Sequence, residues 1–133
     1  MARELCQTTE EARELCASVS AEAPIPLELC VDVGHQCSPD VSGHERDPYH
    51  HLSTLADLTE VVHLQQTDGA YDRHWAFTDE HNAQGIVTRE DVMGIVGRSP
   101  RDAVYLMLEI LHPFEEADAR VLREVKESVA YWR

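Results

Sequence analysis

The sequence predicts an α/β protein in which short parallel strands alternate with amphipathic helices. Three segments of mainly apolar, β-favouring residues, 27–33, 60–65 and 103–110, have the length and composition of strands that are buried on both faces. Around and between them, apolar residues recur at helical spacing. Such alternation implies a parallel sheet with right-handed crossover connections.

The first two helices have clear start signals. Thr8 and Glu11 form a Thr-x-x-Glu capping box ahead of a helix expected over about 9–20. Asp47 followed by Pro48 provides an N-cap with proline at the first helical position, which predicts a short helix from there.

The second half of the chain completes the alternation. Segment 66–86 is polar and aromatic, and it is too long for an ordinary strand-to-helix connection, which favours a functional role. Thr88 opens a third helix that ends near Gly97. A last, amphipathic helix follows Pro113 and carries four apolar residues on one face: Val121, Leu122, Val125 and Val129. The expected order is α-β-α-β-α-β-α.

Length and composition predict one compact domain. The chain has 133 residues, of which 43% are hydrophobic, enough to bury a core. A complete (β/α)8 barrel takes about 250 residues. The alternation alone therefore fits either a small open sheet or about half of such a barrel.

Several classes of protein are disfavoured by composition. No apolar run approaches the ~20 residues that cross a bilayer, and the N-terminus has no secretory signal pattern. The four cysteines, Cys6, Cys16, Cys30 and Cys37, form no Cys-x-x-Cys pair and are expected as reduced thiols. A net charge of −14 and only 11 Lys plus Arg make nucleic acid an unlikely partner. We therefore expect a cytoplasmic protein with no membrane partner.

Each predicted strand ends with a potential metal ligand. Asp32, His63 and Glu109 would meet at the carboxyl edge of the sheet, where parallel α/β proteins bind ligands. Carboxylate and imidazole ligands suit a divalent ion such as Mn²⁺, Mg²⁺, Co²⁺ or Zn²⁺.

Taken singly, each of these residues has an ordinary alternative role. Asp32 could cap a turn, His63 could be a hydrogen-bonded core histidine, and Glu109 could be a partly exposed carboxylate. Three such residues in register on successive apolar strands favour the metal site, because an unpaired buried carboxylate costs several kcal/mol.

The long loop adds side chains that suit a hydroxyl-rich ligand, with a solvated loop packed on the rim of the sheet as the alternative. Arg73 could hold a phosphate or carboxylate. The candidates are Gln65, Gln66, Asp68, Asp72, Arg73, His74, Trp75 and Asn82. The remaining histidines, expected to be surface or packing residues, are His44, His50, His51, His81 and His112.

Five segments together resemble the xylose isomerase-like TIM barrels, especially the sugar and sugar-phosphate isomerases and epimerases. They are Cys30-Val-Asp-Val-Gly-His35, Asp47-Pro-Tyr49, Val62-His-Leu-Gln-Gln-Thr-Asp68, Arg73-His-Trp-Ala-Phe-Thr78 and Leu108-Glu-Ile-Leu-His-Pro113. The resemblance covers nearly the whole chain. It implies that residues 1–133 are the C-terminal half of a (β/α)8 barrel, with the N-terminal half absent.

The resemblance also implies a mechanism. One divalent ion would be held by Glu, Asp, His and Glu, with Asp32, His63 and Glu109 at three of these positions, and would polarise the carbonyl of a sugar or sugar phosphate. A proton would then move between carbons through a metal-stabilised enediolate, with Glu109 as one acid/base and His35 orienting the substrate. Gln66, Arg73 and His74 would contact the substrate, and Arg73 is the candidate for binding a phosphate.

The sequence departs from this pattern at the first glutamate, which is expected just before a segment resembling the start of this chain. Glu4 lies too close to the first helix to replace it. We therefore expect little or no activity from this polypeptide alone. Unpaired edges on strands 27–33 and 104–110 would favour a homodimer.

Two other functions fit parts of the pattern. The chain also resembles zinc-dependent apurinic endonucleases of the endonuclease IV kind, in which Asp72 and His74 would bind a third metal; the acidic balance and the Trp75-Ala-Phe77-Thr78 continuation speak against this. A non-catalytic remnant that serves as an interaction module is the second alternative, and the missing glutamate favours it.

Overall fold

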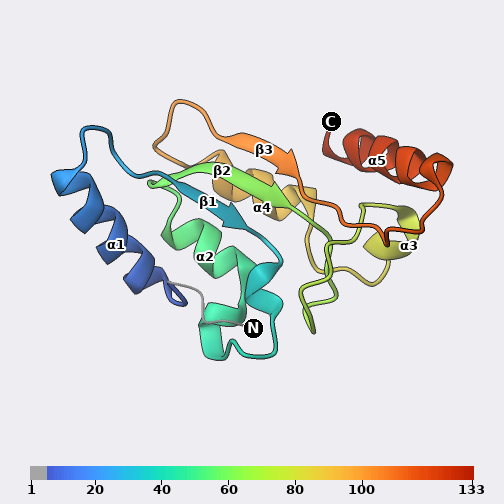
Figure 1. The fold of residues 1–133 in the computed structure, drawn as a ribbon, viewed down its shortest axis with the longest axis horizontal. Helices are drawn as coiled ribbons and strands as arrows, with labels where there is room; N and C mark the ends of the chain where they lie inside the picture. Colours follow the sequence, from blue (N-terminus) through green and yellow to red (C-terminus); the bar gives the residue numbers. More distant parts are fainter. Residues whose placement is uncertain (1–5) are drawn as a thin grey trace.

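The computed structural model describes residues 6–133 and confirms the predicted alternation of helices and strands (Figure 1). The prediction made for Glu4 lies outside the described residues. The three strands are β1 (Leu29–Asp32), β2 (Thr59–Leu64) and β3 (Tyr105–Leu108). The helices are α1 (Thr9–Glu22), η1 (His35–Cys37), η2 (Gly43–Arg46), α2 (Pro48–Thr54), α3 (Asp79–Asn82), α4 (Arg89–Val96) and α5 (Asp118–Trp132).

The strands form one parallel sheet in the order β1-β2-β3. Asp32 pairs with His63, so both residues lie at the carboxyl edge of the sheet. Glu109 follows β3 directly, and its backbone N–H donates to the carbonyl oxygen of Leu64 at 2.9 Å. The register therefore brings the ends of all three strands together, as the sequence predicts.

The helix starts also follow the sequence. At α1, the Thr8 hydroxyl accepts from the backbone N–H of Glu11, whose carboxylate accepts from the N–H of Thr8. The Asp47 carboxylate accepts from the N–H of Tyr49 at the start of α2. These contacts satisfy N–H groups that the first turn of a helix leaves unpaired.

The core lies on one face of the sheet. Val31, Val62 and Leu64 point toward this face and are buried against Leu52 of α2 and Val92 of α4. The Phe77 and Val87 side chains, which flank α3, extend the same apolar cluster. The long loop is thus packed onto the core through its second half.

The prediction that the strands are buried on both faces is wrong. Cys30 is exposed on the opposite face, and Tyr105 and Met107 retain 60% and 52% of their accessible surface. Successive strand residues point to opposite faces, and the helices pack on one face only. Residues 6–133 therefore leave the other face of the sheet open.

Helix α5 also differs from the expectation for an amphipathic helix. Its apolar residues Leu122, Val125 and Val129 are exposed, whereas Glu124 and Ser128 are buried. The Ser128 hydroxyl accepts from the backbone N–H of Phe77 at 2.9 Å, and the Phe77 ring stacks on Tyr131 and meets Trp132 edge-on. These contacts turn the face with Ser128 and the two aromatic residues toward the core.

None of the helices in residues 6–133 is both long and apolar enough to span a membrane.

Candidate active site

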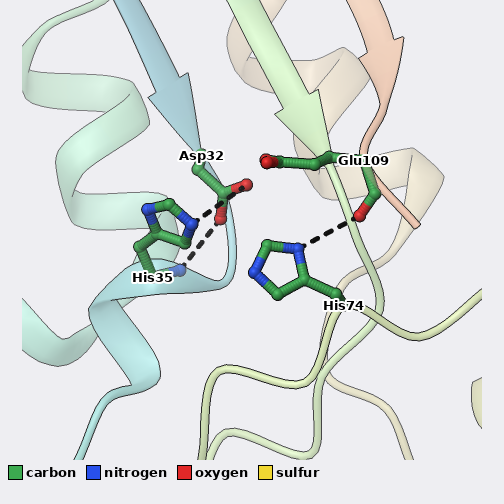
Figure 2. A group of neighbouring side chains, drawn as sticks. All are labelled: Asp32, His35, His74 and Glu109. Carbon is green, nitrogen blue, oxygen red and sulfur yellow. Dashed lines mark hydrogen bonds and ion pairs between the residues drawn. The ribbon is translucent and has the colours of Figure 1, made fainter. Parts of the chain in front are cut away.

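Four side chains converge at the carboxyl edge of the sheet (Figure 2). Asp32 ends β1, His35 begins η1, His74 lies in the long loop, and Glu109 follows β3. One ligand atom from each lies within 4.8 Å of one from every other. Two carboxylates and two imidazoles at this separation form a donor set that suits a divalent ion.

Hydrogen bonds to one carboxylate oxygen hold the Asp32 side chain in place. Oδ1 accepts from the N–H groups of Gly34 and His35 at 2.6 and 2.9 Å, and from the Gln65 amide at 2.9 Å. Oδ2 is buried and has no hydrogen-bond partner. Burial raises the pKa of Asp32, and the nearby Glu109 carboxyl raises it further. A cation beside Oδ2 would compensate this buried oxygen.

The orientation of His74 is set through both its backbone and its ring. Its φ of +52° is in the left-handed region, and its backbone N–H donates to Gln65 Oε1 at 2.6 Å. Its Nδ1 lies 3.2 Å from the carbonyl oxygen of Glu109. A carbonyl can only accept, so Nδ1 donates this hydrogen bond, while Nε2 lies 3.3 Å from both the Gln65 amide nitrogen and Asp72 Oδ1. Metal-bound histidines are commonly held in this way.

Glu109 lies between the other ligands and His63. Its Oε2 is 2.7 Å from His63 Nδ1. The pKa of Glu109 is lowered, first by its interaction with Asp32 and also by His63, against the opposing effect of burial. The sequence predicts His63 as a ligand; the structure places it against Glu109, and His74 joins Asp32, His35 and Glu109 in the cluster.

His35 is the most accessible member of the cluster. Its side chain is 50% exposed, and its Nε2 lies 3.7 Å from Asp72 Oδ2 and 4.0 Å from Asp32 Oδ2. The ring meets that of His74 edge-on, with centroids 5.4 Å apart. His35 therefore borders the site on its open side, where an incoming ligand would meet it.

Gln65, one of the candidates for contacting a hydroxyl-rich ligand, links the residues of the site through hydrogen bonds. It is fully buried, and its amide nitrogen donates to Asp32 and Asp72 while its oxygen accepts from His74. The signal in the sequence is the alternation of a strand: Gln65 lies two residues beyond His63 and so points to the same face.

Gln66, predicted as a substrate contact, lies elsewhere. It is buried, and its amide nitrogen donates to Asn82 and to the carbonyl oxygen of Val87. Its oxygen accepts from the N–H groups of Thr67 and Val87. Because these contacts use the whole amide, Gln66 holds the long loop in place.

Arg73, predicted to bind a phosphate, already has an acidic partner. Its Nε and Nη2 donate to Asp68 Oδ2 at 3.1 and 2.7 Å. Its guanidinium also lies over the rings of Tyr71 and Trp75, at 4.5 and 5.1 Å from their centroids. A phosphate would have to compete with Asp68 for this cation.

One solved structure has the same fold over nearly the whole chain. It is a crystal structure from Rhodospirillum rubrum described as a "Putative Xylose isomerase", with a TM-score of 0.81 and 32% sequence identity. The match covers 99% of this chain and 43% of that one, so this chain spans less than half the length of the protein it matches. No protein-family profile and no curated protein sequence matches the chain.

The fold is therefore xylose isomerase-like. Its three parallel strands and flanking helices correspond to part of a TIM barrel. The four convergent side chains lie at the edge of the sheet where barrels of this kind carry their active sites.

Proposed function

We propose that this chain forms part of a divalent-metal-dependent isomerase or epimerase acting on a sugar or sugar phosphate. The convergence of Asp32, His35, His74 and Glu109 at the carboxyl edge of a xylose isomerase-like sheet supports this function. The unpartnered Oδ2 of Asp32 and the imidazole of His74 are donor groups suited to Mn²⁺, Mg²⁺, Co²⁺ or Zn²⁺.

Each residue has a role that its surroundings favour. A bound ion would act as a Lewis acid that polarises the sugar carbonyl. Asp32, His74 and Glu109 would hold it, and the contact from His63 orients the Glu109 carboxylate. Glu109 would also move a proton at the carbon next to the carbonyl. His35, half exposed and beside Asp72, would bind a substrate hydroxyl.

Substrate binding and turnover place different demands on the chain. Family resemblance implies a second glutamate for the proton transfer, and within residues 6–133 Glu109 is the glutamate of the cluster. We therefore expect ketose binding to be measurable, with turnover weak or absent unless the rest of a barrel is supplied.

The test uses Mn²⁺-loaded chain and a panel of four-carbon to six-carbon ketoses and their phosphates. Mn²⁺ broadens the NMR signals of any sugar bound beside it, and deuterium uptake from D₂O at the carbon next to the carbonyl reports proton transfer. We expect broadening by the wild-type chain and none by Asp32→Ala. Unchanged sugar spectra at saturating Mn²⁺ would refute the proposal.

Two further arms separate the alternatives. Arg73→Ala, compared on a ketose and its phosphate, shows whether Arg73 binds phosphate: a selective loss for the phosphate is the expected result. Abasic DNA serves as the substrate of the competing endonuclease function, and we expect no cleavage. Cleavage lost in Asp32→Ala would replace the isomerase proposal.

A further inference from the structure

We propose a second divalent-cation site, formed by His44, Glu45 and His50 where η2 meets α2. It shares no residue with the candidate active site and does not depend on the proposed function. One ligand atom from each residue lies within 4.8 Å of the others. The donor set of two imidazoles and one carboxylate suits Zn²⁺ or Co²⁺ better than Mg²⁺ or Ca²⁺.

Both imidazoles face the same carboxylate oxygen. Glu45 Oε1 lies 3.4 Å from His44 Nε2 and 3.9 Å from His50 Nε2. Ligands on a tetrahedral Zn²⁺ are about 3.3 Å apart, as bonds of roughly 2.0–2.1 Å require. Small side-chain movements would therefore bring all three onto one ion and leave a fourth position for water.

Glu45 is held in place by Thr9, which contacts both oxygens of its carboxylate. The backbone N–H of Thr9, at the start of α1, donates to Oε2 at 3.2 Å, and the Thr9 hydroxyl donates to Oε1 at 3.3 Å. Its side chain is only 15% exposed. The carboxylate is thus fixed before any ion binds, which lowers the entropy lost on binding.

His51 contacts the other carboxylate oxygen of Glu45. Its side chain is 10% exposed, and Nε2 lies 2.7 Å from Glu45 Oε2. This contact holds Oε2, whereas Oε1 faces His44 and His50.

Neither lysine nor arginine forms an ion pair with Glu45 in the described part of the chain. Within residues 6–133, its ion-pair contacts are all to histidines, namely His44, His50 and His51. A divalent ion would balance this carboxylate and join η2, α2 and, through Thr9, the start of α1.

The test must isolate this site from the active-site cluster. Zn²⁺ is titrated calorimetrically into the full chain at neutral pH, in an Asp32→Ala/Glu109→Ala background that disables the first cluster. We expect one Zn²⁺ per chain to bind there, and adding His44→Ala and His50→Ala to abolish it. Loss of Zn²⁺ binding in the background itself, or binding that survives the histidine changes, would overturn the proposal.

Matched substitutions show whether the loss of Zn²⁺ binding comes from this site alone. Glu45→Gln removes the ligand charge and should weaken Zn²⁺ at least tenfold, whereas Glu10→Gln removes an exposed charge from α1 and should leave affinity unchanged. His44 is largely exposed, so His44→Ala alone should preserve the fold by circular dichroism yet weaken Zn²⁺. Bound Co²⁺ should show the intense visible bands of tetrahedral coordination, and weak octahedral bands would contradict the geometry.

Discussion

Gln65 joins three polar groups of the candidate active site through one side-chain amide. It reaches Asp32, Asp72 and the backbone of His74 without exposure to solvent. Buried hydrogen bonds of this kind fix the rotamers of the side chains they connect. The positions of Asp32 and His74 therefore depend on a residue that need not touch a ligand itself.

The two histidines near Glu109 should respond differently to substitution. His74→Ala removes a candidate ligand and should weaken Mn²⁺ binding by more than about 100-fold. His63→Ala removes a contact that orients Glu109, which typically weakens a metal about 10–100-fold. Calorimetric titration of both variants measures this, and a larger loss in His63→Ala would assign His63 as the ligand.

Among the individual residues of the site, those at the ends of strands could be predicted from the sequence. Asp32 and Glu109 were found because each ends an apolar strand, and parallel register brings such ends together. The place of His74 depends on its positive φ and on a hydrogen bond to Gln65, nine residues earlier in the chain. No local pattern encodes such a contact.

Among the elements, the turn after β1 is the most tightly packed against the site. A Cβ added at Gly34 would lie 2.2–2.6 Å from the buried amide of Gln65. Gly34→Ala should therefore displace Gln65 and destabilise the fold by roughly 1–3 kcal/mol. Thermal unfolding followed by circular dichroism measures the change.

Gly94→Ala is the matched control. It lies within α4, and its added Cβ would come no closer than 3.7 Å to another group, the side chain of Arg98. Replacing glycine by alanine inside a helix should stabilise it by about 0.5–1 kcal/mol. Equal effects of the two substitutions would contradict the role given to the Gly34 turn.

Helix α5 should loosen in acid because of Glu124. Burial alone would raise the pKa of this carboxyl, but hydrogen bonds from Arg120 and His112 outweigh it and lower the pKa below the usual 4.5. The stabilisation is therefore complete above pH 4.5 and lost as pH falls through the lowered pKa. Wild type should be more stable than Glu124→Gln at neutral pH, with the difference shrinking in acid; a difference independent of pH would refute this.

The order and type of the main elements were predictable, whereas the burial of their faces was not. Capping residues and helical periodicity predicted α1, α2 and α4 close to their observed bounds. For β3 and α5, an apolar face was expected to be a buried face, but Met107 and Leu122 are exposed. Sequence periodicity identifies a face that favours burial and does not say what covers it.

For the molecule as a whole, the open sheet face and the apolar face of α5 form surface that favours association. We propose that the isolated chain forms homodimers through this surface or through its strand edges. Light scattering should show the mass rising with concentration. A monomer at all concentrations would contradict this proposal.

Cysteine labelling shows which surface is involved. Cys30 is exposed on the open sheet face, whereas Cys37 is buried and has a pKa raised to about 11 by that burial. Iodoacetamide should label Cys30 in dilute solution and more slowly as the chain associates, with Cys37 unreactive throughout. Unchanged labelling of Cys30 during association would place the contact at another surface.

We propose that Asp32 at the end of β1 and Glu109 after β3, together with His35 and His74, assemble a metal site within this chain. Calorimetric titration of Mn²⁺ into the metal-free protein, beside Asp32→Ala and Glu109→Ala, tests it most directly. The structure predicts saturable binding in the micromolar range that both substitutions abolish. A folded chain that binds no Mn²⁺, or that binds it equally well without Asp32 and Glu109, would contradict the claim.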